Sequence, residues 1–282
     1  MKNILLTGAT GFVGTQVLLN LLNKEFKIHI IIRKGSEKFF KNKSSKIKLI
    51  YTKDLFNENI NWWTNQCKNI DTIIHLAWYT EYNDYLNSPK NIDCLIGSLN
   101  LAKGAIEAGV RRFVGIGTCF EYEFSSKDLT INTPLKPLTI YAGAKAGLYL
   151  SLSKLLPSKS VEFSWCRLFY LYGDGEDERR LVPYIHKQLS KGLLAQLTNG
   201  KQIRDFLDVY KAGKMITDVS MGKQQGPINI CSGNPISVKR LAENIADKYN
   251  RRDLLKFGAR LDNLIDPPRI VGVSNLKTSM QE

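Results

Sequence analysis

Short hydrophobic runs alternate along this chain with stretches in which apolar residues recur every three or four positions. The runs typical of buried strands are KNILLTG (2–8), KIHIIIR (27–33), KIKLIYT (46–52), DTIIHLA (71–77), RRFVGIG (111–117) and VEFSWCRLF (161–169). Helical spacing predicts helices over residues 11–23, 91–108 and 141–156. Near-continuous apolar strands separated by helices are typical of a parallel sheet with both faces covered. We therefore predict an α/β fold.

The pattern changes after about Gly173. Short strands such as GPINI (226–230) now mix with helical stretches, which lie at Arg180–Lys191, Tyr210–Met221 and Val238–Tyr249. We predict one domain over residues 1–173, with some C-terminal segments returning to it, and a smaller lobe over residues 174–282. Such a lobe lies over the C-terminal edge of the sheet, where folds of this class bind ligands.

Composition narrows the class of protein. The 282 residues, 43% of them apolar, suffice for a large core, and no apolar run approaches the length of a membrane span. The five cysteines are scattered and never paired as CxxC, which indicates reduced thiols, no metal site and a cytoplasmic location. We expect neither a membrane association nor a signal peptide.

The net charge of +14 raises the question of nucleic-acid binding. Basic residues concentrate between Arg33 and Lys48 but are otherwise spread along the chain, and we recognise no nucleic-acid-reading module. We interpret the charge as a solvated, lysine-rich surface that attracts anionic small molecules.

Three glycines, Gly8, Gly11 and Gly14, separate the first strand from the first helix. Glycines in such a turn allow the backbone to approach a pyrophosphate, and the helix N-terminus offers N–H groups and a positive dipole end to the anion. The spacing is GxxGxxG, whereas the commonest dinucleotide fingerprint is GxGxxG. A purely structural turn is the alternative, and we favour a dinucleotide-binding site.

The end of the second strand bears on which dinucleotide binds. A carboxylate there contacts a free ribose, whereas an arginine accommodates a 2′-phosphate. The strand ends with Arg33 and Lys34. We therefore expect NADPH, with NADH or NAD possible and a solvated Arg33 as the alternative reading.

Tyr141 and Lys145 form a YxxxK pair that lies on one face of a predicted helix. A lysine so placed can lower the pKa of the phenol, and the tyrosine can then donate a proton to a carbonyl that receives hydride. Tyr210 and Lys214 repeat the spacing, but after a predicted loop of the smaller lobe. Thr118 follows a strand and can hydrogen-bond the same carbonyl oxygen.

Together these residues resemble the extended short-chain dehydrogenase/reductase family, the NAD-dependent epimerases and dehydratases of nucleotide sugars. The resemblance runs from Lys2 to about Gly233 and implies a Rossmann-type doubly wound sheet with a small substrate lobe. It rests on the TGATGFVG segment (7–14), Asp54-Leu55, His75-Leu76-Ala77, Thr118 four residues before Tyr122, Tyr141/Lys145, Arg167-Leu168-Phe169, Arg204-Asp205-Phe206 and Asn229–Gly233. The implied cofactor-binding residues are Gly8, Thr10, Gly11, Phe12, Val13, Gly14, Arg33, Asp54 (with Leu55 at the adenine), Leu76, Ala77, Tyr141 and Lys145. Catalysis is assigned to Thr118, Tyr141 and Lys145, and substrate binding to Thr118, Tyr170 and Arg204, the arginine holding the phosphates.

Departures from the family narrow the chemistry. Its 4,6-dehydratases place Asp-Glu after the catalytic threonine, where this chain has Cys119 and Phe120, and Glu121 is one residue beyond the glutamate of decarboxylating relatives. Cys94 and Tyr170 stand where relatives commonly carry asparagines.

We predict NADPH-dependent reduction of the 4-keto group of a nucleotide-linked 4-keto-6-deoxy sugar in surface-polysaccharide biosynthesis. The alternatives are a 4-epimerase with tightly held NAD and, ranked lower, a non-catalytic NADP(H)-sensing or nucleic-acid-associated protein. The resemblance also implies a homodimer formed by the helices at 91–108 and 141–156.

Overall fold

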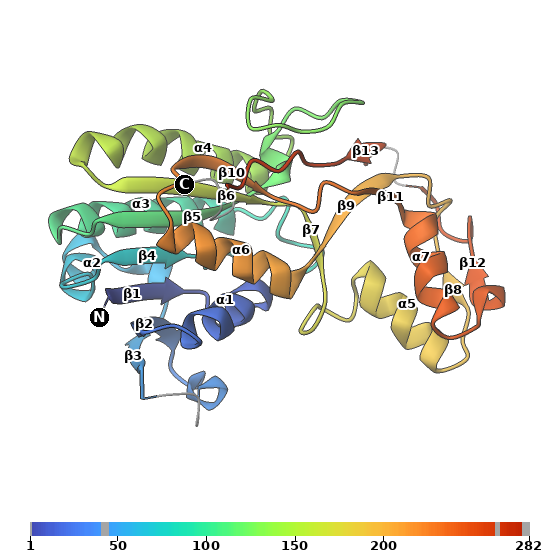
Figure 1. The fold of residues 1–282 in the computed structure, drawn as a ribbon, viewed down its shortest axis with the longest axis horizontal. Coiled ribbons are helices and arrows are strands. Elements are labelled where there is room, and N and C mark those ends of the chain that lie inside the picture. The colour runs from blue at the N-terminus through green and yellow to red at the C-terminus, as the bar shows by residue number, and fades with distance from the viewer. Residues whose placement is uncertain (1, 41–44, 263–265, 278–282) are drawn as a thin grey trace.

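A seven-stranded sheet, parallel throughout, confirms the predicted α/β, Rossmann-type fold (Figure 1). The computed structural model describes residues 2–40, 45–262 and 266–277, so the basic segment 33–48 falls partly outside it. The strand order is β10 (Gly226–Ile230), β6 (Glu162–Leu168), β5 (Arg112–Thr118), β4 (Thr72–His75), β1 (Lys2–Thr7), β2 (Phe26–Arg33) and β3 (Ile47–Thr52). The sheet grows in one direction from β1 to β3 and in the other from β4 onward, so the strand order reverses between β1 and β4. In open α/β sheets, ligands bind beyond the carboxyl ends of the strands at such a switch point.

Helices cover both faces of this sheet because its strands bury alternate residues on opposite sides. Ile4 and Leu6 pack in one core with helices on their side, whereas Leu5 packs in a second core on the other. The first side carries α1 (Phe12–Leu22) and α6 (Val209–Met221). The second carries α2 (Ile60–Gln66), α3 (Lys90–Glu107) and α4 (Ile140–Leu155).

A smaller lobe lies at one end of the main sheet (Figure 1). Its core is formed by α5 (Leu181–Ser190) and α7 (Val238–Asp247). Its strands are β7 (Tyr170–Tyr172), β9 (Ile203–Asp208), β11 (Pro235–Ser237) and β13 (Arg269–Ile270) in one sheet, and β8 (Ala195–Gln196) with β12 (Leu255–Lys256) in another. Single 3₁₀ turns are η1 (Glu37–Phe39), η2 (Leu55–Asn57), η3 (Cys119–Glu121), η4 (Pro157–Lys159) and η5 (Arg252–Leu254).

Two segments beyond residue 173 return to the main domain: β10 is a strand of the main sheet, and α6 packs on one face of that sheet. Strand β10 pairs with β6, because both isoleucines of GPINI are fully buried as in an interior strand. Helix α6 packs against α1 at Gly213, where an added Cβ would stand 2.6 Å from the Cβ of Gln16. The helix predicted over Tyr210–Met221 is therefore present, and Tyr210 lies in its first turn, directly after β9 and not after a loop.

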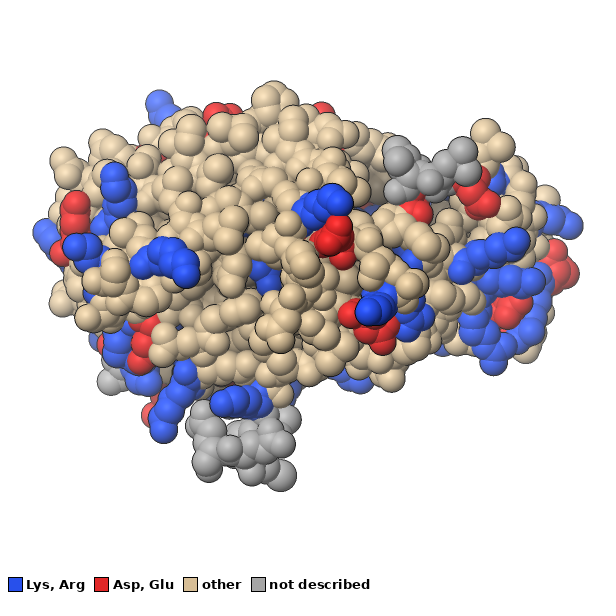
Figure 2. All heavy atoms as spheres, turned by 90° about the horizontal axis from the view of Figure 1, so that it is seen from above, with Lys and Arg blue, Asp and Glu red and all other residues tan. Residues whose placement is uncertain are grey.

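Charged residues of both signs are distributed over the face shown in Figure 2, with acidic side chains among the lysines and arginines. This arrangement fits the interpretation of a solvated basic surface. Across the described ranges, no helix combines the length and the apolar character needed to cross a membrane.

Candidate active site

The carboxyl ends of β1, β4 and β5 meet near the switch point of the sheet, and the predicted site residues follow these strand ends. A hydrogen bond from the Ala77 N–H to the Thr7 hydroxyl (3.2 Å) ties the chain after β4 to β1. His75 bridges Thr7 (Nδ1, 2.8 Å) and Ser98 of α3 (Nε2, 2.8 Å). Burial, reinforced by the charge of Lys145, lowers the pKa of His75 to about 3, so its ring is a neutral structural bridge.

The turn between β1 and α1 leaves no room for side chains at two of its glycines. Gly8 has φ +73°, and a Cβ there would lie 2.7 Å from the Ala77 nitrogen. A Cβ on Gly14 would lie 2.0 Å from the Gly8 oxygen. Gly11 is the N-cap of α1 and donates its N–H to Gly8 (3.0 Å).

Beyond this turn, the helix N-terminus is open to an anion. The first turn of α1 contains no acidic residue, and Thr10 and Gly11 are exposed while Phe12 and Val13 are half-buried. The first N–H groups of any helix lack intrahelical partners. The turn and helix start therefore fit the pyrophosphate of a dinucleotide.

The other predicted cofactor contacts lie along the same edge of the sheet. Arg33 is exposed at the end of β2, and Leu76 directly follows β4. Asp54 caps η2, where it accepts hydrogen bonds from the Phe56 N–H (3.0 Å) and the Asn57 amide (3.1 Å). These hydrogen bonds give Asp54 a structural role as the cap of η2. The predicted contact of Asp54 and Leu55 with the adenine stays a prediction.

The predicted catalytic residues come together from β5 and α4. Thr118 ends β5, while Tyr141 and Lys145 lie one turn apart in the first half of α4, which Thr139 caps (3.2 Å to the Ala142 N–H). Lys145 is 4% exposed and donates a hydrogen bond of 2.7 Å to the Ile116 carbonyl oxygen of β5. Strand β5 thus positions the lysine as well as the threonine.

The electrostatics of this trio differ in one respect from the expectation. Burial raises the pKa of Tyr141, with the neighbouring Tyr85 adding to the rise and the Thr118 side chain opposing it. Desolvation therefore outweighs the lowering of this pKa that was predicted from Lys145. Burial also lowers the pKa of Lys145 to about 7, although Glu121 and Cys94 oppose the change.

The buried ion pair between Glu121 and Arg167 holds the backbone of Thr118 in place. Glu121 accepts hydrogen bonds from the Thr118 N–H (2.8 Å), from the Trp165 indole (3.0 Å) and from Arg167 (2.7 Å), and neither charged group is more than 1% exposed. The Thr118 hydroxyl also accepts from the Phe120 N–H (3.3 Å). Glu121 is therefore a structural residue that fixes the end of β5.

Two further residues beside the trio, Trp78 and Asn91, were not predicted from the sequence. The ring of Trp78 lies 3.7 Å from the Lys145 nitrogen, and its indole N–H donates to the fully buried Asn91 (2.8 Å). The signal that could have suggested Trp78 was its position directly after His75-Leu76-Ala77. Asn91 has no comparable signal.

Arg204 lies in β9 at the lobe side of the site. Only 3% exposed, it forms an ion pair of 2.6 Å with Asp266 and lies 5.4 Å from the centre of the Tyr170 ring. Tyr170 packs against Phe120 (6.1 Å between ring centres), two residues beyond Thr118. Through Tyr170, the predicted phosphate-binding arginine is therefore linked to η3, the turn that directly follows Thr118.

The loops at 78–85 and 172–180 contact each other. Arg179 forms an ion pair with Glu81 (3.2 Å) and lies 4.8 Å from the ring centre of Tyr82. Nearby, burial raises the pKa of Glu176 to about 7. The loops at 78–85 and 172–180 are therefore held together by Arg179.

The second YxxxK pair has a different environment. Tyr210 is 53% exposed, and Lys214 is engaged in an ion pair with Asp218 (2.6 Å).

All five cysteines are buried and free. Within the described residues, no group of histidine, cysteine and carboxylate side chains could hold a metal ion.

Comparison with known proteins places this geometry in context. The model of the NAD-dependent epimerase/dehydratase family matches residues 4–231. The chain is 25% identical to dTDP-6-deoxy-L-talose 4-dehydrogenase (NAD(+)) of Aggregatibacter actinomycetemcomitans over 257 residues, 90% of this chain and 93% of that one.

Two solved structures have the same fold. One is a UDP-N-acetylglucosamine 4-epimerase from Methanobrevibacter ruminantium M1 (TM-score 0.85, 21% identity, covering 97% of this chain and 90% of that one). The other is a dTDP-glucose 4,6-dehydratase from Streptomyces venezuelae with NAD bound (TM-score 0.83, 18% identity, covering 96% of this chain and 88% of that one).

Proposed function

The chain belongs to the NAD-dependent epimerase/dehydratase family, enzymes of the extended short-chain dehydrogenase/reductase type, and on this premise we propose that it reduces the 4-keto group of a nucleotide-linked 4-keto-6-deoxy sugar. One observation carries the proposal: Tyr141, Lys145 and Thr118 lie together, while Phe120, two residues beyond Thr118, packs its ring against Phe124 and Tyr170. An aromatic group there cannot remove or supply the protons that dehydration needs. Reduction requires only the trio and a hydride donor.

The chain supplies the proton and the polarisation for this step. The Tyr141 phenol donates its proton to the carbonyl oxygen, to which the Thr118 hydroxyl donates a hydrogen bond. The Lys145 ammonium stabilises the phenolate that remains. A nicotinamide cofactor, when bound, would supply the hydride. Its pyrophosphate would be held at the glycine turn, where Gly8 and Gly14 leave no room for a Cβ.

Cofactor preference is assigned to Arg33. Its guanidinium is exposed at the carboxyl end of β2, the position from which an arginine meets a ribose 2′-phosphate. We therefore propose NADPH as the working reductant. The name of the relative from A. actinomycetemcomitans specifies NAD(+). Binding measurements should therefore compare the affinity for NADPH with the affinity for NADH.

Substrate phosphates are assigned to Arg204. A buried guanidinium that already holds one carboxylate, Asp266, is suited to exchange that partner for a diphosphate. Tyr170, which packs beside Arg204, would then contact the sugar nucleotide on the path to Thr118.

The direct test follows NADPH consumption with a panel of nucleotide 4-keto-6-deoxy sugars that differ in the base and in the sugar configuration. We expect one member to be reduced, with the configuration of the new alcohol at C4 read by NMR. Absence of turnover with the whole panel, for a folded protein that binds NADPH, would contradict the proposal.

The second candidate is a nucleotide-sugar 4-epimerase, favoured by the structural similarity to the M. ruminantium enzyme. An epimerase retains NAD and turns over without added reductant. Purified protein that carries stoichiometric NAD and interconverts C4 epimers without NADPH would therefore establish this alternative. Family membership makes the chain an enzyme, so the non-catalytic alternative loses its support.

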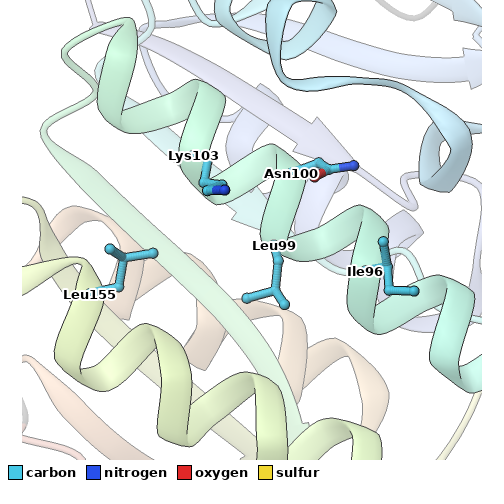
Figure 3. A pocket seen from close by; sticks show the side chains of 5 residues that line it. All are labelled: Ile96, Leu99, Asn100, Lys103 and Leu155. Atoms are coloured by element: carbon cyan, nitrogen blue, oxygen red, sulfur yellow. The ribbon is translucent and has the colours of Figure 1, made fainter.

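We further propose that two copies pair through α3 and α4. Ile96 (53% exposed) and Leu150 (54%) leave apolar side chains on this face. A hollow of about 260 Å³ opens between the helices, lined by Ile96, Leu99, Asn100, Lys103 and Leu155 (Figure 3). Light scattering should report a dimer for the parent and a monomer for Ile96→Glu.

The remaining part of the proposal concerns context. A reduced 6-deoxy sugar on a nucleotide is a donor for glycosyl transfer, so we propose a role in surface-polysaccharide biosynthesis. Five buried, free thiols fit a reducing compartment, and we propose a cytoplasmic location on that ground.

A further inference from the structure

The ammonium of Lys145 has an aromatic partner that its catalytic assignment does not explain. Its nitrogen lies 3.7 Å from the centre of the Trp78 ring, well inside the range of a cation–π contact, and 6.0 Å from the ring of Trp165. The same nitrogen donates to the Ile116 carbonyl oxygen at 2.7 Å. The cation is thus placed between a backbone oxygen and an indole face.

Trp78 is itself held in place. Its indole N–H donates to the Asn91 side-chain oxygen (2.8 Å), and the Asn91 amide donates to the carbonyl oxygens of Tyr85 (2.6 Å) and Ser88 (2.9 Å). Asn91 is fully buried in the first turn of α3, and these three hydrogen bonds occupy both its side-chain oxygen and its side-chain nitrogen.

The loop that Asn91 organises reaches Tyr141 as well. The Tyr85 ring meets the Tyr141 ring edge to face at 5.1 Å, and the Leu86 carbonyl oxygen accepts the Tyr141 N–H (3.0 Å). One buried amide therefore orients a segment that contacts both side chains of the YxxxK pair.

We propose that Trp78 is a positioning residue, whose indole face stabilises the charged Lys145 ammonium against the Ile116 carbonyl oxygen, and that Asn91 fixes the orientation of the indole. The contact stands independently of the substrate, whereas its catalytic consequence rests on the proposed function. The ring acts through Lys145: it keeps the lysine charged, which the phenolate of Tyr141 requires.

Groups other than Trp78 also affect the pKa of Lys145, and the test must separate their effects from that of the indole ring. Glu121 of η3 and Cys94 of α3 favour its charged form, and burial disfavours it. His75 of β4 and Tyr141 of α4 also titrate nearby, but burial keeps both neutral at the pH of interest. Removing the aromatic face while keeping an apolar side chain leaves these groups in place.

The experiment compares Trp78→Leu, Trp78→Phe and the control Trp62→Leu, a half-buried tryptophan on α2. The first readout is the titration of Lys145 in the cofactor-free protein, followed by NMR of ¹³Cε-labelled lysine and assigned by the loss of its signal in Lys145→Met. Trp78→Leu should lower this pKa by about 0.5 to 1 unit, the size of a cation–π contact. Trp78→Phe, which retains a ring face, and Trp62→Leu should stay close to the parent value.

The second readout is the pH dependence of kcat in the cofactor-loaded enzyme. Deprotonation of Lys145 sets the high-pH limb, so Trp78→Leu should shift this limb to lower pH without raising the KM for the sugar nucleotide. The proposal is overturned if Trp78→Leu leaves the titration unchanged or moves it upward, if Trp78→Phe moves it as far, or if the limb stays in place. Failure of the proposed function is distinct: no nucleotide sugar is turned over, while the titration shifts as described.

Discussion

Replacing Tyr141 with phenylalanine is the most informative single perturbation of this site. The change removes one oxygen and retains the ring, so the edge contact with Tyr85 (5.1 Å between ring centres) and the backbone of α4 persist. The phenol oxygen hydrogen-bonds the Thr118 side chain in the folded chain, and the substitution removes this bond. Loss of such a hydrogen bond costs about 0.5–1.5 kcal/mol of unfolding free energy.

The expected effect on catalysis is much larger. General acid catalysis contributes about 10²–10⁴-fold, and turnover should fall by that factor, equivalent to about 3–5 kcal/mol in activation free energy. Tyr141→Phe should leave the KM for the sugar nucleotide little changed, since the proton moves only in the transition state. The assay is NADPH consumption at saturating substrate, beside NADPH binding by calorimetry and an unfolding curve in denaturant.

Tyr210→Phe provides the matched control, because Tyr210 has the same YxxxK spacing in a different environment. Its side chain is 53% exposed, and Lys214 is held by Asp218. An exposed substitution of this kind changes free energies by about 0.5 kcal/mol at most, so turnover should stay within about twofold of the parent. A loss of activity in Tyr210→Phe together with a fully active Tyr141→Phe would refute the placement of the active site.

Three further substitutions probe the cofactor, the substrate and the buried support. Arg33→Ala should weaken NADPH binding by about 1.5–3 kcal/mol and NADH binding much less; equal losses in parallel titrations would show that Arg33 does not read the 2′-phosphate. Arg204→Ala should raise the KM for the sugar nucleotide at least about tenfold with NADPH affinity retained, and an unaltered KM would move phosphate recognition elsewhere. Arg167→Met should lower the unfolding free energy by about 3–5 kcal/mol, because it leaves the Glu121 carboxylate buried without its ion-pair partner. Denaturant unfolding checks this value, and the double variant with Glu121→Gln should recover part of the loss.

Much of this fold could be predicted from local pattern. Strands buried on both faces need continuous apolar runs, and KIHIIIR lies within β2 (Phe26–Arg33) as expected. The glycine turn was also predictable, because a left-handed residue such as Gly8 and a helix packed as closely as at Gly14 exclude side chains. Helical geometry alone placed Tyr141 and Lys145 on one face of α4.

Only the tertiary structure shows the strand pairings, side-chain contacts and burial that involve residues far apart in the chain. The pattern of GPINI predicts a short strand but does not show which sheet it belongs to. Its pairing with β6 places it in the main sheet. The contact of Trp78 with Lys145 and the ion pair of Arg204 with Asp266 arise from chain segments with no shared local pattern. Spacing predicted that Lys145 would lower the pKa of Tyr141, but burial raises it, because desolvation depends on everything that packs around the phenol rather than on its neighbours in sequence.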